Sequence, residues 1–278
     1  MMVKSFKISE NIKNEMIKRY HEFSSPPPKY ASHAFKLSYF SIVIYDSLKV
    51  VFSGDFSNEE VDQWISKTSY YTTNLIGSDE VGTGDFFGPI IVCAAYISED
   101  DLERLKQLNI IDSKNLSDEK IMELAKNIIT FIKYKTVECD NKRYNDLYSK
   151  GYNIKQILAI MHKKAIDSFG ENGSVVIDQF VSKSVFEKYV NSKVNYIFET
   201  KGESKYLAIA TASIIARALF IKRMDEIAKK LGELKIIYGA GVECDRFAQK
   251  LFKKHGYNLE NYIKKNFKNY DRIKENIK

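Results

Sequence analysis

The segment from Ile76 to Pro89 brings together the residue types that chemistry on a phosphate backbone requires. Two adjacent acids, Asp79 and Glu80, are followed by three glycines, a threonine and a third acid. Carboxylate oxygens are the hard ligands that Mg²⁺ and Mn²⁺ take, and glycines let backbone amides approach a phosphate or a sugar. An acid pair at the surface beside an ordinary turn would leave a similar pattern. The apolar segments on both sides favour the metal and phosphate site.

Two further acids stand next to apolar segments and could join the first pair. Asp178 follows the short apolar run Val175–Ile177, and Glu203 precedes an alanine-rich stretch. Four carboxylates in one place would repel one another and take up protons, whereas two divalent cations would balance their charge. Two such cations, roughly 3.5 to 4 Å apart, can activate a water and stabilise the leaving oxygen in phosphodiester hydrolysis. Taken singly, Asp178 could belong to a turn and Glu203 could be a helix N-terminal charge.

The elements that must position these acids form a domain of mixed strands and helices. Apolar and alternating runs predict strands at residues 75–76, 90–96, 131–139, 175–177 and 195–198. Helical periodicity predicts a helix capped by Ser117, a second over residues 154–165 and a long third over residues 204–231. The third is rich in alanine, so it could lie close against the sheet. Asp79 and Glu80 would then follow the first strand.

A separate small domain is predicted in front of this one. Three prolines at 26–28 must end a first helix, which has one apolar face. Residues 34–45 and 50–52 then predict a hairpin, and Ser57 with Glu60 forms a capping box before a second helix. We therefore expect a first domain over residues 1–66, a joint over residues 67–73 and a main domain over residues 74–278.

Composition limits the class of protein. With 278 residues, 44% of them hydrophobic, the chain can bury a real core. The longest apolar run, Leu207–Ile215, is far shorter than the roughly 20 residues that a membrane span needs, and no signal peptide is evident. The three cysteines have no metal-like spacing and predict buried, reduced thiols. The four histidines are scattered, which argues against a zinc site or a histidine-based triad.

Basic residues gather in the last part of a chain whose formal net charge is +7. From residue 250 onward nine basic residues face three acids; the basic ones are Lys250, Lys253, Lys254, Lys264, Lys265, Lys268, Arg272, Lys274 and Lys278. This excess would suit a polyanionic partner. It would equally suit a solvated helix face.

Several motifs together resemble the type 2 ribonucleases H, and specifically their ribonuclease HIII branch. The segment Gly77–Pro89 is similar to the opening motif of that branch, with Thr83 where ribonucleases HII typically carry arginine. Other landmarks of the family follow in order, at residues 112–117, 176–178, 201–205, 210–217 and 239–242. The likeness covers about residues 70 to 270. The first domain resembles the small domain, similar to half of a TATA-binding protein, that precedes the catalytic domain in ribonuclease HIII.

The resemblance implies an α/β fold with a ribonuclease H-like mixed sheet flanked by helices, preceded by a small α+β domain. It implies that Asp79, Glu80, Asp178 and Glu203 are the catalytic carboxylates and bind two Mg²⁺ or Mn²⁺ ions. Glu203 stands where ribonucleases HII usually have aspartate, which fits the HIII branch.

The resemblance also implies the residues that contact substrate. The amides of Gly82, Thr83 and Gly84 would contact the sugar and phosphate and read the 2′-hydroxyl that separates RNA from DNA. Lys114 would contact a phosphate, although a solvated loop lysine would look the same in sequence. Asp85 would be structural, because four ligands already suffice.

The expected function is that of an endoribonuclease that cuts the RNA strand of RNA/DNA hybrids and leaves 3′-hydroxyl and 5′-phosphate ends. We expect a cytoplasmic monomer that binds no membrane and grips the hybrid with its first domain. Excision at single embedded ribonucleotides, as in ribonuclease HII, is the alternative that Thr83 and the extra domain disfavour. A non-catalytic hybrid-binding protein would gain nothing from acids facing phosphates. A phosphate-loop hydrolase is excluded, because no Gly-Lys-Ser or Gly-Lys-Thr follows Gly84.

Overall fold

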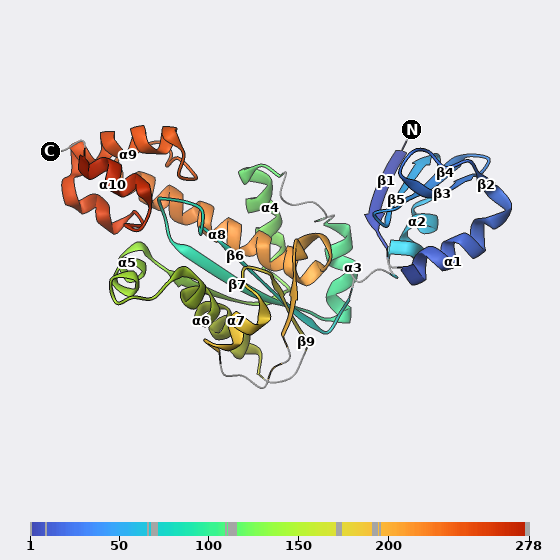
Figure 1. The fold of residues 1–278 in the computed structure, drawn as a ribbon, viewed down its shortest axis with the longest axis horizontal. Coiled ribbons are helices and arrows are strands. Elements are labelled where there is room, and N and C mark those ends of the chain that lie inside the picture. Colours follow the sequence, from blue (N-terminus) through green and yellow to red (C-terminus); the bar gives the residue numbers. More distant parts are fainter. Residues whose placement is uncertain are drawn as a thin grey trace. The chain divides into compact units, whose positions relative to one another are not determined.

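The computed structural model describes residues 2–8, 10–65, 67, 72–108, 110, 116–170, 174–190, 194 and 196–275. The chain divides into two compact units, residues 1–72 and residues 73–278 (Figure 1). The division falls inside the segment 67–73 that the sequence indicates as a joint. Each unit has a hydrophobic core of its own.

The first unit is an antiparallel sheet with two helices packed on it. The strands lie in the order β1 (Met2–Lys7), β5 (Lys49–Gly54), β4 (Phe40–Tyr45), β3 (Ala31–Lys36) and β2 (Ser24–Ser25). Helices α1 (Glu10–Tyr20) and α2 (Asn58–Ile65) bury Met16, Val61 and Trp64 against the sheet. The indole N–H of Trp64 donates to the hydroxyl of Tyr20 at 2.7 Å, which ties the two helices together.

The predicted hairpin is wrong in one respect, because residues 34–45 do not form one strand. They belong to β3 and β4, and the amide of Leu37 donates to the carbonyl of Phe40 at 2.9 Å in the turn between them. Gly54 at the end of β5 lies against that turn, where a Cβ would be 2.5 Å from the carbonyl oxygen of Tyr39. Strand β1 was not predicted, because it is largely exposed and so lacks the apolar run of a buried strand.

The main unit is built on a mixed sheet. Its strands lie in the order β10 (Tyr196–Glu199), β9 (Ser174–Asp178), β6 (Leu75–Val81), β7 (Ile90–Ile97) and β8 (Lys133–Cys139). The central strand β6 pairs parallel with β9 and antiparallel with β7. Helix α8 (Leu207–Leu231) covers one face of the sheet and α6 (Ile154–Ile166) covers the other (Figure 1).

Other helices surround this framework. They are α3 (Glu99–Gln107), α4 (Asp118–Ile128), α5 (Asn141–Ser149), α7 (Lys183–Glu187), α9 (Val242–His255) and α10 (Lys268–Glu275). Of these, only α4 was predicted, and the side chain of its cap Ser117 accepts from the amide of Lys120 as expected. Helix α3 was missed because Leu105 is its one buried residue, so its sequence shows no apolar stripe.

Two element boundaries differ from expectation near the acids. Strand β6 does not end at Ile76 but runs to Val81, because pairing with β7 continues through Asp79 and Glu80. The long helix begins at Leu207 rather than at Ser204, and residues Gly202–Ser204 form the short 3₁₀ turn η5. As a result, Asp79 and Glu80 belong to strand β6, and Glu203 belongs to the turn η5.

Two expectations from composition can be compared with the structure. All three cysteines are buried and free, as predicted. Among the helices that the structure describes, none is long and apolar enough to cross a membrane.

Candidate active site

Asp79 and Glu80 lie inside β6, so their side chains point to opposite faces of the sheet. Asp79 shares the α8 face with Gly77, where a Cβ would be 2.2 Å from the carbonyl carbon of Ala208. The hydroxyl of Ser213 on α8 donates to the Asp79 carboxylate. Glu80 instead lies on the α6 face and contacts His162. The two acids therefore meet different environments although they are neighbours in sequence.

Asp178 lies beside Asp79 because of the parallel register of two strands. Ser78 is paired with Ile177, and one residue further along each strand come Asp79 and Asp178. Burial raises the pKa of the Asp79 carboxyl well above its usual range, and the charges of Glu80 and Asp178 raise it further. Three of the four predicted acids are thus close enough to interact electrostatically.

Glu203 lies in the turn η5, whose backbone contacts Asp178. The amide of Gly202 donates to Oδ1 of Asp178 at 2.6 Å, so the backbone next to Glu203 is tied to that acid. A Cβ at residue 202 would lie 2.4 Å from Cδ1 of Ile209 and 3.2 Å from Oδ1 of Asp178, so the turn packs closely on both residues. The side chain of Glu203 is buried. The sequence motif at residues 201–205 therefore builds a connection between β9 and α8.

These acids fit a divalent cation by their chemistry. Asp79 is 8% exposed, and a buried carboxylate beside two others carries a charge that a cation would balance. Within the described residues, no three His, Cys, Asp or Glu side chains converge as a ready metal site. A bound cation would offset the mutual repulsion of these carboxylates. Asp79, Glu80, Asp178 and Glu203 are the residues that would hold Mg²⁺ or Mn²⁺.

His162 is a site residue that the sequence did not reveal. Its side chain is fully buried on α6, stacks on Phe180 with ring centroids 4.8 Å apart, and shares a 2.8 Å hydrogen bond with Ser78. Its Nε2 lies 3.1 Å from Oε2 of Glu80. A lone histidine in a helical pattern gives no signal of this contact, which depends on how α6 packs on β6. His162 orients Glu80.

The loop after β6 contains glycines with different roles. Gly82 has φ +89°, and a Cβ there would lie 2.2 Å from the carbonyl oxygen of Pro89. Gly84 is exposed, and a Cβ there would meet nothing within 4 Å. Thr83 between them is half-buried. Gly82 is therefore required by the fold, whereas Gly84 leaves its backbone open to a ligand.

The structure bears on the predicted role of Asp85 but not on that of Lys114. Asp85 is structural, as expected, because its Oδ1 accepts from the amide of Gly239 at 2.5 Å. Lys114 lies outside the described residues. Two positions later, the carbonyl of Leu116 accepts from Nη2 of Arg217 at 2.9 Å, which anchors the beginning of α4 to α8.

Comparisons with known proteins agree with this architecture. The model of the ribonuclease HII family matches residues 76–270, and a domain of unknown function (DUF3378) matches residues 5–74. The chain is 40% identical over 257 residues to ribonuclease HIII of Staphylococcus epidermidis, covering 83% of each chain. It is 35% identical to ribonuclease HIII of Bacillus cereus, covering 95% of each.

A solved structure gives the same result for the fold. The crystal structure of Bst-RNase HIII in complex with Mn²⁺ matches with a TM-score of 0.72 and 28% sequence identity. The match covers 100% of this chain and 99% of that one. The likeness therefore includes both units.

Proposed function

Because this chain belongs to the ribonuclease HIII branch of the ribonuclease HII family, we propose that it cuts the RNA strand of RNA/DNA hybrids. It is an endoribonuclease, and the predicted family and fold class are confirmed. The observation that carries the proposal is the placement of Asp79 beside Asp178 on adjacent parallel strands, with Glu80 in the same strand. This arrangement gathers negative charge where a phosphodiester reaction needs cations.

The proposed reaction is hydrolysis with two divalent ions, which leaves 3′-hydroxyl and 5′-phosphate ends. Bound Mg²⁺ or Mn²⁺ would supply an activated water and stabilise the leaving oxygen. Asp79 would help to hold the ions, since its carboxylate interacts with those of Glu80 in its own strand and Asp178 in the next. Glu80, Asp178 and Glu203 would complete the ligand set. His162 would keep Glu80 in place by its hydrogen bond to Oε2.

Substrate recognition would use the loop after β6. The open backbone at Gly84 would let amides approach the ribose, where the 2′-hydroxyl distinguishes RNA from DNA. Thr83 and Gly82 belong to the same loop, and Lys114 would add a phosphate contact. The first unit would grip the hybrid. We expect a monomer that works in the cytoplasm.

The Asp79→Asn variant tests the catalytic role. The amide cannot supply an anionic metal ligand, so we expect cleavage of a hybrid to be abolished while hybrid binding persists. Cleavage would be measured in Mg²⁺ and in Mn²⁺, and binding would be measured separately. Asp100→Asn, at an exposed acid of α3, is the matched control and should cleave normally. Undiminished turnover by Asp79→Asn would refute the assignment.

A second substrate in the same assay distinguishes the alternative activity. A DNA duplex with one embedded ribonucleotide would be compared with a continuous RNA/DNA hybrid. We expect the continuous hybrid to be cut preferentially. Preferential cutting at the single ribonucleotide would show a ribonuclease HII-like specificity instead.

A further inference from the structure

Lys264 is a buried lysine in a segment whose sequence indicates exposed positive charge. The sequence groups it with eight other basic residues that would face solvent or a polyanion, but its side chain is only 1% exposed. Neither a solvated helix face nor a nucleic-acid surface accounts for this residue. A lysine is almost never fully buried unless it has partners, so its contacts indicate its role.

The ammonium group of Lys264 bonds to the turn that follows the glycine loop. Its Nζ donates to the carbonyl oxygen of Asp85 at 2.7 Å and to that of Gly88 at 2.6 Å. Its own amide donates to the carbonyl of Phe86 at 2.9 Å. Among the described residues, Lys264 forms no ion pair, so its partners are backbone carbonyls. It therefore bonds to backbone on both sides of Phe87.

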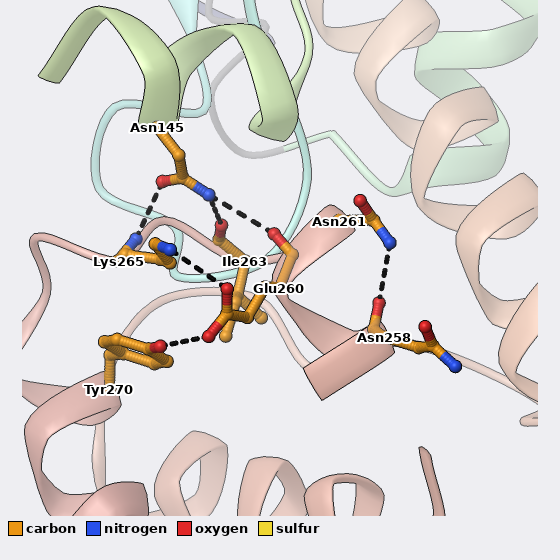
Figure 2. Close-up of polar contacts among 7 residues, drawn as sticks. All are labelled: Asn145, Asn258, Glu260, Asn261, Ile263, Lys265 and Tyr270. Atoms are coloured by element: carbon orange, nitrogen blue, oxygen red, sulfur yellow. Dashed lines mark hydrogen bonds and ion pairs between the residues drawn. The ribbon is translucent and has the colours of Figure 1, made fainter. Parts of the chain in front are cut away.

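The backbone on either side of Lys264 is itself fixed from α5. The side-chain amide of Asn145 donates to the carbonyl of Ile263 at 3.0 Å, and its oxygen accepts from the amide of Lys265 at 3.0 Å (Figure 2). Glu260 accepts from Lys265 and from the hydroxyl of Tyr270, which ties the same segment to α10. Lys264 is consequently held on both sides before its ammonium reaches the turn.

The far side of the same turn is held by a second contact. The amide of Phe86 donates to the carbonyl of Gly239 at 2.9 Å, while the amide of Gly239 donates to Asp85. The side-chain amide of Asn141 adds a bond to the carbonyl of Gly88 at 2.9 Å. The glycine loop over residues 82–84 thus leads directly into a turn that is fixed from three directions.

We propose that Lys264 is a positioning residue for substrate recognition, which fixes the turn at Asp85–Gly88 and thereby sets the glycine loop against the ribose of the RNA strand. This inference rests on the proposed function. Lys264 has no place in the reaction itself, because its ammonium contacts carbonyls of the chain and is shielded from solvent. Its effect passes through the backbone of residues 82–84 to the substrate.

The chemistry of a lysine suits this role. A single Nζ can donate to two carbonyls at once, which an apolar side chain of similar length cannot do. Burial lowers the pKa of Lys264 to about 7, while nearby Asp85 and Cys139 act in the opposite direction. Even a neutral amine keeps two N–H donors, so both carbonyls can remain bonded on either side of that pH. The two hydrogen bonds therefore do not require the charged form of Lys264.

The test compares Lys264→Met with Lys265→Met in the full chain. Methionine keeps most of the volume but removes the donors, whereas Lys265 is the adjacent, more exposed lysine paired with Glu260. We expect Lys264→Met to raise the KM for hybrid about tenfold or more, with a much smaller change in kcat, because substrate positioning is lost. Lys265→Met should change neither value by more than about twofold, because it removes only an exposed ion pair and Tyr270 still bonds to Glu260.

A binding measurement separates positioning from general loss of structure. The affinities for an RNA/DNA hybrid and for a DNA duplex of the same sequence would be measured in Ca²⁺. Lys264→Met should lower the ratio of hybrid to duplex affinity, because the glycine loop is what reads the 2′-hydroxyl. A folded Lys264→Met protein with unchanged KM and unchanged ratio would overturn the inference.

A second variant covers the case in which Lys264→Met does not fold. Asn145→Ala keeps the Lys264 side chain but removes the hydrogen bonds to the backbone on both sides of it. It should therefore lower the ratio of hybrid to duplex affinity, by less than Lys264→Met does. An unchanged ratio in a folded Asn145→Ala protein would then overturn the inference. If the unaltered chain fails to cut hybrids, the proposed function fails, while the binding ratio still tests Lys264.

Discussion

Asp79 and Glu80 show how the surroundings give different properties to adjacent acids. Asp79 is buried against α8 next to Asp178, and its pKa is raised by burial and by its acidic neighbours. Glu80 is on the opposite face and is more exposed, with His162 against its Oε2. The proposed ligand set would therefore draw on both faces of one strand, with Asp79 in contact with α8 and Glu80 in contact with α6.

The His162→Phe variant tests whether the second of these helices supports metal binding. Phenylalanine can keep the stacking on Phe180 but removes both ring nitrogens. Glu80 and Ser78 each lose the hydrogen bond that they share with His162. Loss of such a supporting contact typically costs 10- to 100-fold in metal affinity or activity. We expect the Mn²⁺ concentration for half-maximal cleavage to rise by about that factor.

The control for this variant is His21→Phe, which alters an exposed histidine of the first unit. It should leave the Mn²⁺ dependence unchanged. A His162→Phe protein with normal Mn²⁺ dependence would show that Glu80 needs no support from α6.

The sequence singles out the candidate acids but not the residues that contact them. Asp79, Asp178 and Glu203 stand out because charges next to apolar runs are expensive to bury without a reason. His162 and Lys264 give no such signal, since one is a lone histidine and the other is in a basic stretch. Their roles depend on contacts across 82 and 179 residues of chain, which only the tertiary fold creates.

At the scale of elements, the close approach of β6 and α8 controls where Asp79 lies. Gly77 faces the backbone of α8, and a Cβ there would be 2.3 Å from the amide nitrogen of Ile209. Backbone atoms cannot rotate out of the way as a side chain can. The alanines of α8 complete this contact from the other side, as the sequence predicts.

A pair of glycine substitutions separates folding from recognition. Gly77→Ala must push α8 away from β6, so we expect the free energy of unfolding to fall by about 1–3 kcal/mol or more. The methyl group of Gly84→Ala has no atom within 4 Å, so this variant should change the free energy of unfolding by less than about 0.5 kcal/mol. Its methyl group would instead obstruct the ribose and raise the KM for hybrid. Denaturant unfolding and cleavage kinetics would measure both effects.

The contrast between the two glycines is what matters in this experiment. Equal loss of stability in both variants would contradict the assignment of Gly84 to an open surface. An unchanged KM for Gly84→Ala would contradict its role in recognition.

Element prediction succeeds where the core is continuous and fails where pairing or packing overrides local pattern. Strands β7 and β9 and helix α6 are apolar enough to be read directly from the sequence. Strand β6 was cut short, because Gly77 to Glu80 look like a loop until the ladder with β7 is considered. Helices α3 and α5 each bury one or two residues, so neither shows a clear apolar stripe.

At the scale of the molecule, the two units are independent enough to be tested separately. The core of the first unit contains residues from Ile8 to Ile65, and that of the main unit contains residues from Ile76 onward. Deleting residues 1–72 should leave a folded main unit. If the first unit grips the hybrid, the Kd for hybrid should rise by at least about tenfold, because two linked binding sites reinforce one another.

Binding and turnover must both be measured for this deletion. We expect kcat at saturating hybrid to be largely retained, because all four predicted acids lie in the main unit. Circular dichroism would confirm that the main unit is folded. An unchanged Kd in a folded deletion protein would show that the first unit has another role.

The contact between Lys264 and Asp85 also has a consequence for the order in which the enzyme is made. The two residues are 179 positions apart, so a ribosome translating at typical speed needs roughly 10 to 40 s to pass from one to the other. During that time the nascent chain already contains Asp79, Glu80 and the glycine loop. The turn after the loop cannot form its hydrogen bond to Lys264 until Lys264 has left the ribosome, so the site gains this support only after 179 further residues have been synthesised.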